Sequence, residues 1–347
     1  MRTCKYAYEF ATHNAGSTNV NLPTFADIEA AAARIRPYAF ETPLIENANL
    51  NARMGRRVFI KAEPFQRTGS FKFRGACNHI LLIAESERKN GVVAFSSGNH
   101  AQGVAAAAEI FGIPATIVMP SDAPRVKVEG TRSYGAEIVF YDRRSEDREA
   151  IASEICAKRG ATLVRPFDDA GVIAGQGTIG LEVAHTLAAK GIAIDEVFVP
   201  CGGGGLLTGT ALAVTTLQPT AKVVAVEPYD YDGMGRSLAA GERVRVPAKE
   251  SSIADSLLPP TPGEITFALA RKVVSRAEVM RDDDFARAVS YSVRTLKIVA
   301  EPGGAAGLAA LLRTAAKSSA GATVVVISGG NCDPEMLTAC CAKFTMP

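Results

Sequence analysis

The chain of 347 residues is 47% hydrophobic and 21% charged, and its formal net charge is +2. Such a composition is typical of a globular protein with two domains or one large one. Because the charge is close to balanced, there is no electrostatic case for binding nucleic acid or a membrane surface, and no run of about 18 apolar residues predicts a membrane span. Seven scattered cysteines without CxxC spacing favour reduced thiols and a cytoplasmic protein. Residues 1–21 are polar and lack the apolar core of a signal peptide, so we expect them to be partly mobile.

The predicted elements start with a helix over Phe25–Ile35, for which Thr24 is a suitable N-cap. From residue 58 onward, short apolar strands alternate with helices. The predicted strands are residues 58–60, 92–95, 115–119, 137–141, 162–164, 197–199, 223–226, 272–274 and 323–327. The predicted helices are residues 76–87, 101–111, 127–134, 147–159, 178–190, 206–217, 282–297 and 304–314. Residues 229–262 are rich in Gly, Pro and charge, which predicts long loops with at most short helices.

Short apolar strands that alternate with helices are typical of parallel sheets covered on both faces. We therefore predict an α/β fold with two doubly wound parallel-sheet domains, of which the smaller is inserted in the larger. The expected large domain comprises residues 1–74 and 169–347, and the expected small domain comprises residues 75–168. Ligands of such sheets bind at the carboxyl ends of the strands. Several loops of small residues fall at that end.

One lysine stands out in the stretch Thr68–Ala76, which follows the predicted strand at residues 58–60. Lys72 lies at the opening of a predicted helix, where the partial positive charge of the helix N-terminus disfavours the ammonium form. Such a lysine can have a lowered pKa and act as a nucleophilic amine or as a base. The alternative is a surface lysine with its charge in water, which is where most lysines lie.

Four consecutive glycines, Gly202–Gly205, separate an apolar strand from an amphipathic helix. Ordering four glycines costs conformational entropy. A direct reason to have them is a backbone that wraps its N–H groups around an anion at a helix N-terminus. The loop lacks the Gly-Lys-Ser/Thr ending of a P-loop, so the pattern indicates a single phosphate ester and not a nucleoside triphosphate. A flexible surface turn is the alternative.

Residues Gly175–Gly180 match the GxGxxG pattern, and Asp195 lies 20 positions after Gly175. A dinucleotide site requires these glycines in a tight turn between a strand and a helix, followed by an acidic residue at the end of the next strand. Here several residues separate the preceding strand from the first glycine, and Asp195 precedes a strand. The context therefore argues against a nicotinamide-dependent oxidoreductase.

Two further loops follow predicted strands. Ser96–His100 offers hydroxyls, an amide and backbone donors at a helix start, which suits a carboxylate, although Ser and Asn are also ordinary helix caps. Ser328, followed by Gly329 and Gly330, can present its hydroxyl to one ligand atom, although a simple turn is the alternative. Together with Lys72, these loops describe a ligand with a phosphate, a carboxylate and a carbonyl that reacts with an amine.

In their order and residue types the motifs resemble the fold-type II pyridoxal-phosphate enzymes, in particular the threonine/serine dehydratase and serine racemase group. The likeness extends from Phe25 to the C-terminus. It implies that the cofactor is pyridoxal 5′-phosphate, held as an imine by Lys72, with Phe71 beside its ring, Asn99 at its 3′-oxygen, Ser328 at its pyridine nitrogen, and Gly202, Gly203, Gly204 and Gly205 at its phosphate. It further implies that the substrate carboxylate is bound by Ser96, Ser97, Asn99 and His100. Arg148 aligns with an arginine near the distal end of the substrate, although a solvated helix arginine is an equal alternative.

The activity that the resemblance implies is dehydration of a 3-hydroxy amino acid to a 2-oxo acid and ammonia. Lys72, displaced from the cofactor by the substrate amine, would remove the α-proton as general base. Ser97 occupies the position of a second acid/base on the opposite face of the cofactor ring, so amino-acid racemisation is an alternative main activity. A non-catalytic ligand-binding protein is an alternative of another class. Threonine, serine, 3-hydroxyaspartate and a 3-aryl serine all stay open as substrates.

Relatives in this group place a glutamate and a downstream aspartate around a divalent or monovalent cation. Glu227 matches the glutamate, but Gly233 stands at the aspartate position and Asp232 lies one residue earlier. Hard cations need several oxygen ligands, so a metal site formed by Glu227 and Asp232 is a weaker expectation than the cofactor site. The resemblance also implies a homodimer.

Overall fold

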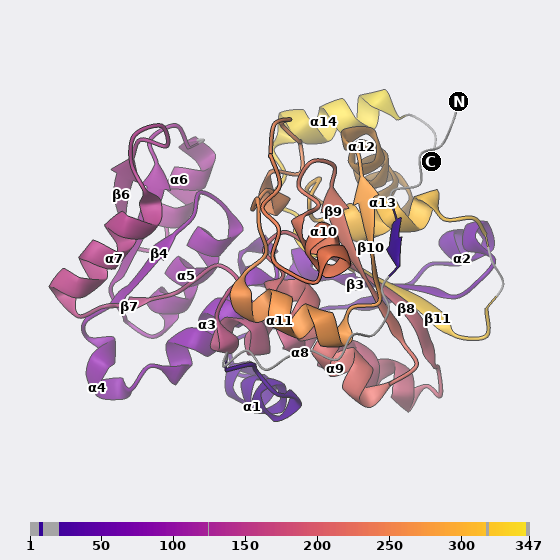
Figure 1. Cartoon of the computed structure of the whole chain (residues 1–347), viewed down its shortest axis with the longest axis horizontal. Coiled ribbons are helices and arrows are strands. Elements are labelled where there is room, and N and C mark those ends of the chain that lie inside the picture. Colours follow the sequence, from indigo (N-terminus) through magenta and orange to yellow (C-terminus); the bar gives the residue numbers. More distant parts are fainter. Residues whose placement is uncertain (1–6, 10–20, 124, 317–318, 345–347) are drawn as a thin grey trace.

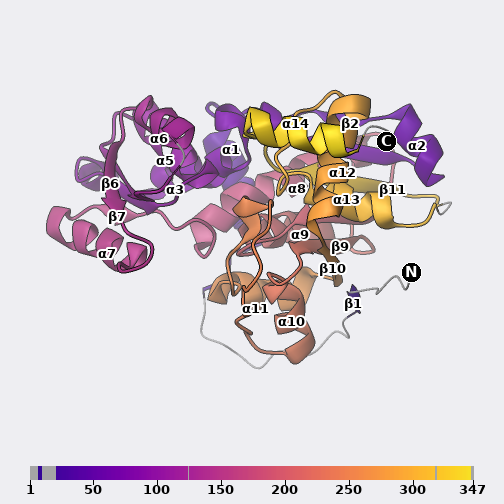
Figure 2. The same cartoon turned by 90° about the horizontal axis from the view of Figure 1, so that it is seen from above.

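The computed structural model describes residues 7–9, 21–123, 125–316 and 319–344. These residues form two α/β lobes of unequal size that lie next to each other (Figure 1, Figure 2). Most of residues 1–21, for which we expect mobility, lie outside the described residues. Among the described helices, none is both long enough and apolar enough to cross a membrane.

Within the described residues, the larger sheet has the strand order β1-β10-β9-β8-β11-β3-β2 and the smaller sheet the order β6-β5-β4-β7. All neighbours in the smaller sheet are parallel, whereas the larger sheet is parallel from β10 to β3 and antiparallel at its two edge pairs. The large-sheet strands are β1 (Ala7–Glu9), β2 (Leu44–Glu46), β3 (Val58–Ala62), β8 (Ile194–Pro200), β9 (Lys222–Pro228), β10 (Arg276–Met280) and β11 (Ala322–Ile327). The small-sheet strands are β4 (Val92–Phe95), β5 (Ala115–Pro120), β6 (Glu137–Tyr141) and β7 (Thr162–Leu163).

The helices that surround these sheets follow the strands in alternation. In the first half of the chain they are α1 (Phe25–Ile35), α2 (Ala48–Met54), α3 (Lys72–Leu82), α4 (Glu85–Arg88), α5 (Asn99–Ile110), α6 (Arg125–Arg132), α7 (Arg148–Arg159) and α8 (Ala170–Ala189). In the second half they are α9 (Gly205–Leu217), α10 (Gly233–Ala240), α11 (Glu264–Val273), α12 (Asp282–Tyr291), α13 (Ala306–Arg313) and α14 (Pro334–Lys343). Short 3-10 turns occur at η1 (Glu63–Phe65), η2 (Arg67–Gly69) and η3 (Asp255–Leu257).

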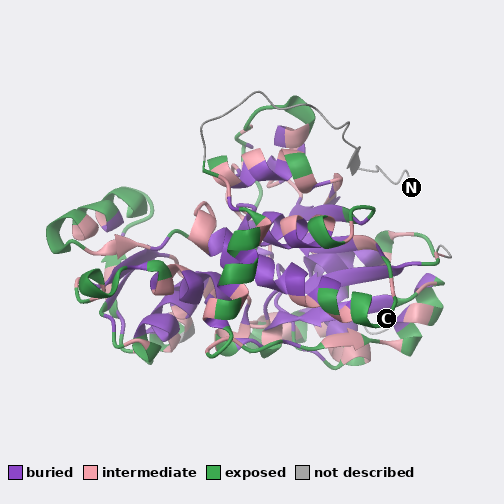
Figure 3. Cartoon of the chain, turned by 90° about the horizontal axis from the view of Figure 1, so that it is seen from below, coloured by how far each residue is buried: buried purple, intermediate pink, exposed green. Residues whose placement is uncertain are grey.

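Both faces of the large sheet are buried, and β11 shows how the sequence achieves this. Val324 and Val326 pack in the core beside α8 and α9, whereas Val325 and Ile327 pack in the core beside α12 and α13. Successive side chains of a strand point to opposite faces, so a continuous apolar run is needed where helices cover both. Figure 3 shows the central strands buried in both lobes. The predicted doubly wound α/β fold is therefore confirmed.

The small lobe is inserted between β3 and β8, as predicted. All strands of the smaller sheet come from residues 92–163, and all strands of the larger sheet lie outside that range. The domain boundaries that we place at residues 74/75 and 168/169 stay a prediction. The nearest helix starts are Lys72 for α3 and Ala170 for α8. Helix α1 has the predicted bounds, and the Thr24 hydroxyl accepts the Asp27 N–H as a capping box.

The GxGxxG stretch lies inside α8, with no turn at its glycines. A Cβ at Gly175 would lie 2.7 Å from the Arg74 carbonyl oxygen, and one at Gly180 would lie 2.4 Å from the Thr210 carbonyl oxygen. The glycines therefore allow α8 to approach α3 and α9 closely, which is a packing role and not a dinucleotide-binding one. They also explain why the sequence predicts a helix only from residue 178, since glycine has a low helix propensity.

The predicted strand at residues 272–274 is wrong. These residues end helix α11, and β10 follows at Arg276–Met280. The β-branched residues that suggested a strand stand at the last turn of an amphipathic helix, which buries Thr266, Phe267, Leu269 and Ala270 at helical spacing. The predicted helix at residues 282–297 ends at Tyr291 and continues as a π-helical turn, and α14 was not predicted.

Candidate active site

The segment that carries Lys72 is attached to the carboxyl end of β11. Ser70 forms an isolated antiparallel bridge with Gly329, and the Phe71 N–H donates to the Ser328 carbonyl at 3.0 Å. Ser328 is 4% exposed and follows the last residue of β11. These contacts bring Lys72, the first residue of α3, beside Ser328, although the two are far apart in sequence.

The amine of Lys72 is partly buried and is held by two neighbours. Its Nζ donates to the Pro166 carbonyl at 2.6 Å and lies 5.1 Å from the centroid of the Phe71 ring. Burial lowers the pKa of Lys72 to about 8, and the Glu301 carboxylate opposes this shift. A fall of this size increases the neutral fraction of the amine at pH 7 by roughly a hundredfold or more. The neutral amine is the form that reacts with a carbonyl.

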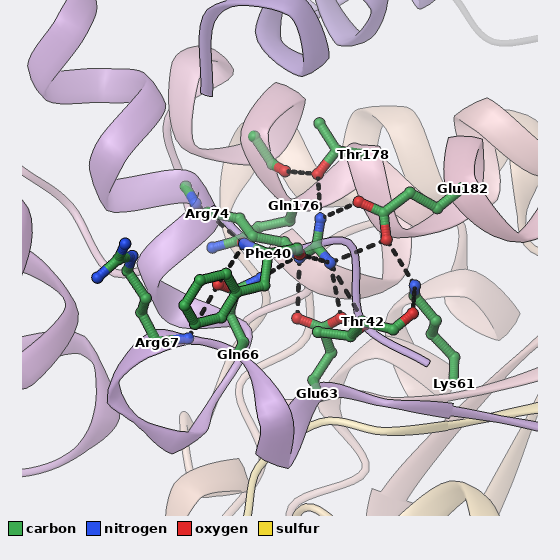
Figure 4. A network of polar contacts seen from close by, with 12 residues as sticks. Phe40, Thr42, Lys61, Glu63, Gln66, Arg67, Arg74, Gln176, Thr178 and Glu182 are labelled. Carbon is green, nitrogen blue, oxygen red and sulfur yellow. Dashed lines mark hydrogen bonds and ion pairs between the residues drawn. The ribbon is translucent and has the colours of Figure 1, made fainter. Parts of the chain in front are cut away.

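Two residues after Lys72, Arg74 lies at the centre of a buried polar network (Figure 4). Its guanidinium is 1% exposed and donates to Glu63 at 2.8 Å and to Glu182 at 2.5 Å. Lys61 pairs with the same Glu182 at 2.5 Å. Two cations thus balance two carboxylates, and removal of one member would leave a buried charge unpaired. The network joins α3 to β3, η1 and α8, and this fixes the place from which Lys72 projects.

The loop Gly202–Gly205 has no room for side chains. A Cβ at Gly203 would lie 2.3 Å from the Phe167 ring, and Gly204 has a φ of 102°. Within the described residues, the N–H groups of this loop donate to no backbone carbonyl. Because they lie at the positively polarised start of α9, they can bind a phosphate group.

Asn99 begins α5 and is held by hydrogen bonds at both ends of its amide. Its Nδ2 donates to Glu301 Oε1 at 2.6 Å, and its Oδ1 accepts from Asn331 Nδ2 at 2.8 Å. Asn331 also donates to the Thr68 carbonyl at 2.7 Å. The Asn99 amide is therefore connected across the lobes to the segment that precedes Lys72.

Ser96 and Ser97 lie in the half-buried loop between β4 and α5. The Ser96 hydroxyl accepts the N–H two residues later at 3.2 Å. Arg148, the first residue of α7, is exposed, and its guanidinium lies 5.3 Å from the ring centroid of Phe95, which ends β4. Arg148 therefore stands at the same end of the small sheet as the serine loop.

The side chain of His100 faces the interior of the small lobe. It is 3% exposed, and its Nε2 lies 2.8 Å from the Val164 carbonyl oxygen. Burial, and then the nearby Lys72 charge, lower the pKa of His100 to about 3, so the ring is neutral. Because the ring faces the interior, only the backbone N–H of His100 is available at the helix start. The contact between His100 and a substrate carboxylate stays a prediction, and it would be made by this N–H.

Glu227, near the end of β9, and Asp232 are both buried. The Glu227 carboxylate accepts the N–H groups of Met234 and Gly235, each at 2.8 Å, while Asp232 pairs with Arg236 at 2.9 Å. Burial raises the pKa of Glu227 to about 8. Among the described residues, His, Cys, Asp and Glu form no group of three or more that could hold a metal ion. The cation site stays a prediction.

Three groups at this site were not predicted from the sequence: the Pro166 carbonyl, Asn331 and Glu301. Asn331 directly follows the predicted loop at Ser328, so its place at a strand end was a usable signal. Glu301 stands between apolar residues and a pair of glycines, and a lone carboxylate in such a run is also a signal. No pattern distinguishes the Pro166 carbonyl.

Comparisons with known proteins agree with this arrangement. The family description "Pyridoxal-phosphate dependent enzyme" matches residues 35–330. The chain is 42% identical to an L-threo-3-hydroxyaspartate ammonia-lyase of Pseudomonas sp., over 91% of this chain and 98% of the relative, and 39% identical to a serine racemase of Schizosaccharomyces pombe, over 92% and 97%. Among solved structures, maize serine racemase superimposes with a TM-score of 0.86 at 36% identity and covers 93% of this chain and 98% of its own.

The residues present fit the cofactor of this family. A partly buried amine of lowered pKa suits an aldehyde, and a glycine loop with unbonded N–H groups at a helix start suits a phosphate. The buried Ser328 accepts the N–H of Phe71, the residue before this lysine. The enclosed loop around Gly203 also excludes the surface-turn alternative, because Phe167 covers it. The chain therefore belongs to the pyridoxal-phosphate dependent enzymes.

Proposed function

We propose that this protein is an ammonia-lyase that converts a 3-hydroxy amino acid to a 2-oxo acid and ammonia. The observation that carries the proposal is the attachment of the Lys72 segment to Ser328 and Gly329 at the end of β11. The proposal is also supported by relatives whose names are L-threo-3-hydroxyaspartate ammonia-lyase and L-threonine ammonia-lyase. In this proposal Lys72 holds the cofactor, and after displacement by the substrate amine it accepts the α-proton at Nζ. Bound pyridoxal phosphate withdraws electrons from the substrate α-carbon.

The other proposed roles follow from the contacts of each residue. Gly202, Gly203, Gly204 and Gly205 bind the cofactor phosphate through their N–H groups. Phe71 would lie beside the cofactor ring, Asn99 would contact its 3′-oxygen, and Ser328 would be the neutral partner of its pyridine nitrogen. The loop at the start of α5 binds the substrate carboxylate through Ser96, Ser97, Asn99 and the backbone of His100.

For the substrate, we propose a preference for a second carboxylate, as in 3-hydroxyaspartate. Arg148 is exposed at the strand end next to the serine loop, and an arginine there can pair with a distal carboxylate. The names of two relatives, L-threo-3-hydroxyaspartate ammonia-lyases of Saccharomyces cerevisiae and Pseudomonas sp., support this choice over threonine, serine or a 3-aryl serine.

The test is a panel of threonine, serine, threo-3-hydroxyaspartate and 3-phenylserine, with release of 2-oxo acid as the readout. Lys72→Ala should abolish release from every substrate. Arg148→Ala should lower kcat/KM for 3-hydroxyaspartate by about tenfold or more and leave that for threonine within a few fold, because only the former loses an ion pair. Arg144→Ala, which removes another exposed arginine of the small lobe, is the matched control. Equal losses for both substrates would contradict the role of Arg148.

A serine-type racemase is the second candidate, favoured by Ser97 at the serine loop and by the serine racemases among the relatives. Chiral analysis of serine turnover separates the two activities, since faster inversion than oxo-acid release would make racemisation the main one. A non-catalytic binding protein would release no oxo acid and invert no substrate, although Lys72 would still bind the cofactor.

We further propose a homodimer in the cytoplasm. Phe40, Phe65 and Val299 are each about half exposed, and contacts through Gln66 and Pro64 place them around the segment that precedes Lys72. Such a cluster of exposed apolar side chains is typical of a protein interface. Phe65→Asp should therefore yield monomers in sedimentation velocity, while Phe140→Asp, a similarly exposed site on the small lobe, should not.

For the cation we propose a site at Glu227 and Asp232. The test is whether added Mg²⁺ or K⁺ raises the activity of protein that has been treated with a chelator.

A further inference from the structure

A buried carboxylate at the centre of the site has no role in the function proposed above. Glu301 is 6% exposed and lies in the segment that precedes α13. Its backbone N–H donates to the Gly329 carbonyl at 3.1 Å, and its Oε1 accepts from Asn99 Nδ2 at 2.6 Å. Buried carboxylates are rare unless they are paired or functional. No basic side chain forms an ion pair with Glu301 among the described residues.

Gly329 leaves the space that this carboxylate occupies, because a Cβ there would lie 2.4 Å from Glu301 Oε1. Gly329 has no positive φ, so the close approach of the Glu301 side chain, and not the backbone conformation, requires glycine there. Gly304 lets the backbone of Gly329 come close, since a Cβ at Gly304 would lie 2.3 Å from the Gly329 carbonyl oxygen and 3.1 Å from Glu301 Cγ.

The backbone at Ser328 and Gly329 forms hydrogen bonds both with Glu301 and with the segment that leads into Lys72. Gly329, which accepts the Glu301 N–H, pairs with Ser70, and the carbonyl of the preceding residue accepts the Phe71 N–H. A Cβ at Gly329 would lie 3.2 Å from the Ser70 Cβ as well as against the Glu301 carboxylate. Glu301 and the segment that leads into Lys72 are therefore held by the same two residues after β11, Ser328 and Gly329.

The charged and titratable groups near Glu301 belong to several different elements. Burial raises the pKa of Glu301 to about 7, Asp255 adds to this effect, and Asn99, Lys127 and Lys72 oppose it. The titratable groups that face the carboxylate are Asp255 from η3, Lys127 from α6, Lys72 from α3 and the Cys332 thiol after β11. Lys72 is the one of these that the proposed reaction protonates.

We propose that Glu301 is a positioning residue that stabilises the ammonium formed when Lys72 takes up the α-proton of the substrate. In this step the substrate C–H bond breaks, an Nζ–H bond forms, and the electron pair stays with the substrate. Glu301 acts in its ionised form and exchanges no proton. A fixed negative charge near a developing positive charge lowers the barrier most where water is excluded. The inference rests on Lys72 as the base of the proposed function, and it holds for dehydration and racemisation alike.

The first test measures the step itself in the holoenzyme. Glu301→Gln keeps a side-chain oxygen that can accept the Asn99 amide and removes only the charge. Exchange of the α-hydrogen of alanine with D₂O, followed by NMR, reports proton removal without requiring a leaving hydroxyl. We expect Glu301→Gln to slow this exchange by about tenfold or more and Glu301→Asp to restore part of the rate. Glu196→Gln is the matched control, since it removes a partly buried carboxylate near the amino end of β8. Equal exchange rates in wild type and Glu301→Gln would overturn the proposal.

The second test measures the effect of Glu301 on the amine without any turnover. The rate at which acetic anhydride modifies Lys72 in the full-length apoprotein, followed by mass spectrometry as a function of pH, gives the pKa of the amine. Loss of the carboxylate should lower that pKa, so Lys72 should be modified several-fold faster at pH 7 in Glu301→Gln than in wild type or Glu196→Gln. An unchanged profile would overturn the proposal even if activity is lost. Failure of the lyase assignment is distinct, because it would abolish oxo-acid release while the exchange and modification results persist.

Discussion

At the scale of single residues, the glycine loop that we propose as the phosphate site has no room for one methyl group. A Cβ at Gly203 would lie 2.3 Å from the Phe167 ring, and three glycines flank it on one side or the other. Either the ring or the loop must move to admit the methyl group, and a move of the loop changes the positions of its N–H groups. Gly203 is thus the position at which the smallest change should affect cofactor binding most.

We expect Gly203→Ala to weaken pyridoxal-phosphate binding by about tenfold or more, measured by titration of the apoprotein with the cofactor. Gly130→Ala in α6 is the matched control, because its Cβ would meet its nearest neighbour, Gln102, at 3.6 Å, which is ordinary contact. Cofactor binding by Gly203→Ala with wild-type affinity would show that the loop does not hold the phosphate.

The buried carboxyl of Glu301 also makes the stability of the apoprotein depend on pH. Its pKa is about 7 in the folded protein, against an ordinary value of 4.5. Between these values the native state binds more protons than the unfolded state, so the contribution of Glu301 to stability falls as the pH rises from 4.5 through 7. Other groups titrate in this window, so a variant that lacks only this carboxyl is the proper reference.

We therefore expect the free energy of unfolding of Glu301→Gln, relative to wild type, to rise with pH between 4.5 and 7 and to level off above that range. Urea unfolding of the two apoproteins at a series of pH values provides the measurement. A difference that does not vary with pH would mean that Glu301 titrates normally in the folded protein.

At the scale of elements, the packing of α8 depends on glycines that imitate a nucleotide-binding motif. The helix contacts α1, α3 and α9, and a Cβ at Gly180 would lie 2.4 Å from the Thr210 carbonyl oxygen in α9. The obstructing atom belongs to a backbone that is itself hydrogen bonded, so it cannot rotate away as a side-chain end could. The contact between α8 and α9 must open instead.

Gly180→Ala should lower the free energy of unfolding by about 1–3 kcal/mol, measured by urea unfolding of the holoenzyme. The same substitution at Gly130, an open helical position, should be neutral or slightly stabilising, because alanine favours the helix. An unchanged free energy of unfolding in Gly180→Ala would indicate that α8 and α9 adjust easily.

The same helix predicts the outcome of a binding experiment. Titration of wild type with NAD should show no binding, since these glycines are inside a helix.

At the scale of the whole molecule, an ion pair joins the two lobes beside the site. Lys127 of α6 and Asp255 of η3 lie 2.8 Å apart, and their side chains are 30% and 54% exposed. An ion pair this exposed contributes at most about 1 kcal/mol to folding. Its position matters more, because η3 also packs against the glycine loop, where a Cβ at Gly202 would lie 3.2 Å from the Leu257 Cα.

Lys127→Ala should therefore raise KM for the substrate several-fold and change the free energy of unfolding by less than about 1 kcal/mol. The rise in KM should shrink at high salt, where the pair in wild type is also screened. Lys158→Ala, which breaks an exposed ion pair within α7 alone, should leave KM unchanged. Identical effects of the two substitutions would exclude a role for the contact between the lobes.

The sequence alone determined the fold class, most of the alternation of strands and helices between residues 58 and 226, and the loops of the candidate site. Apolar runs such as Val324–Ile327 can be buried on both faces only in a covered parallel sheet, and the carboxyl ends of such strands must carry the ligand. Gly202–Gly205 and Ser328 could therefore be predicted because each follows a strand, and Lys72 because it opens a helix. Errors occurred where local composition conflicted with packing, as at the end of α11.

The tertiary structure alone decided which groups from distant segments touch the site. The Pro166 carbonyl contacts Lys72, the Asn331 amide contacts Thr68, and the Glu301 carboxylate contacts Asn99, with separations in sequence of 94, 263 and 202 residues. It also decided that the glycines of α8 serve packing, and that the His100 ring faces the interior. Periodicity and strand ends follow from local chemistry, whereas burial, the pKa of an amine and the neighbours of a carboxylate depend on atoms brought together from distant parts of the chain.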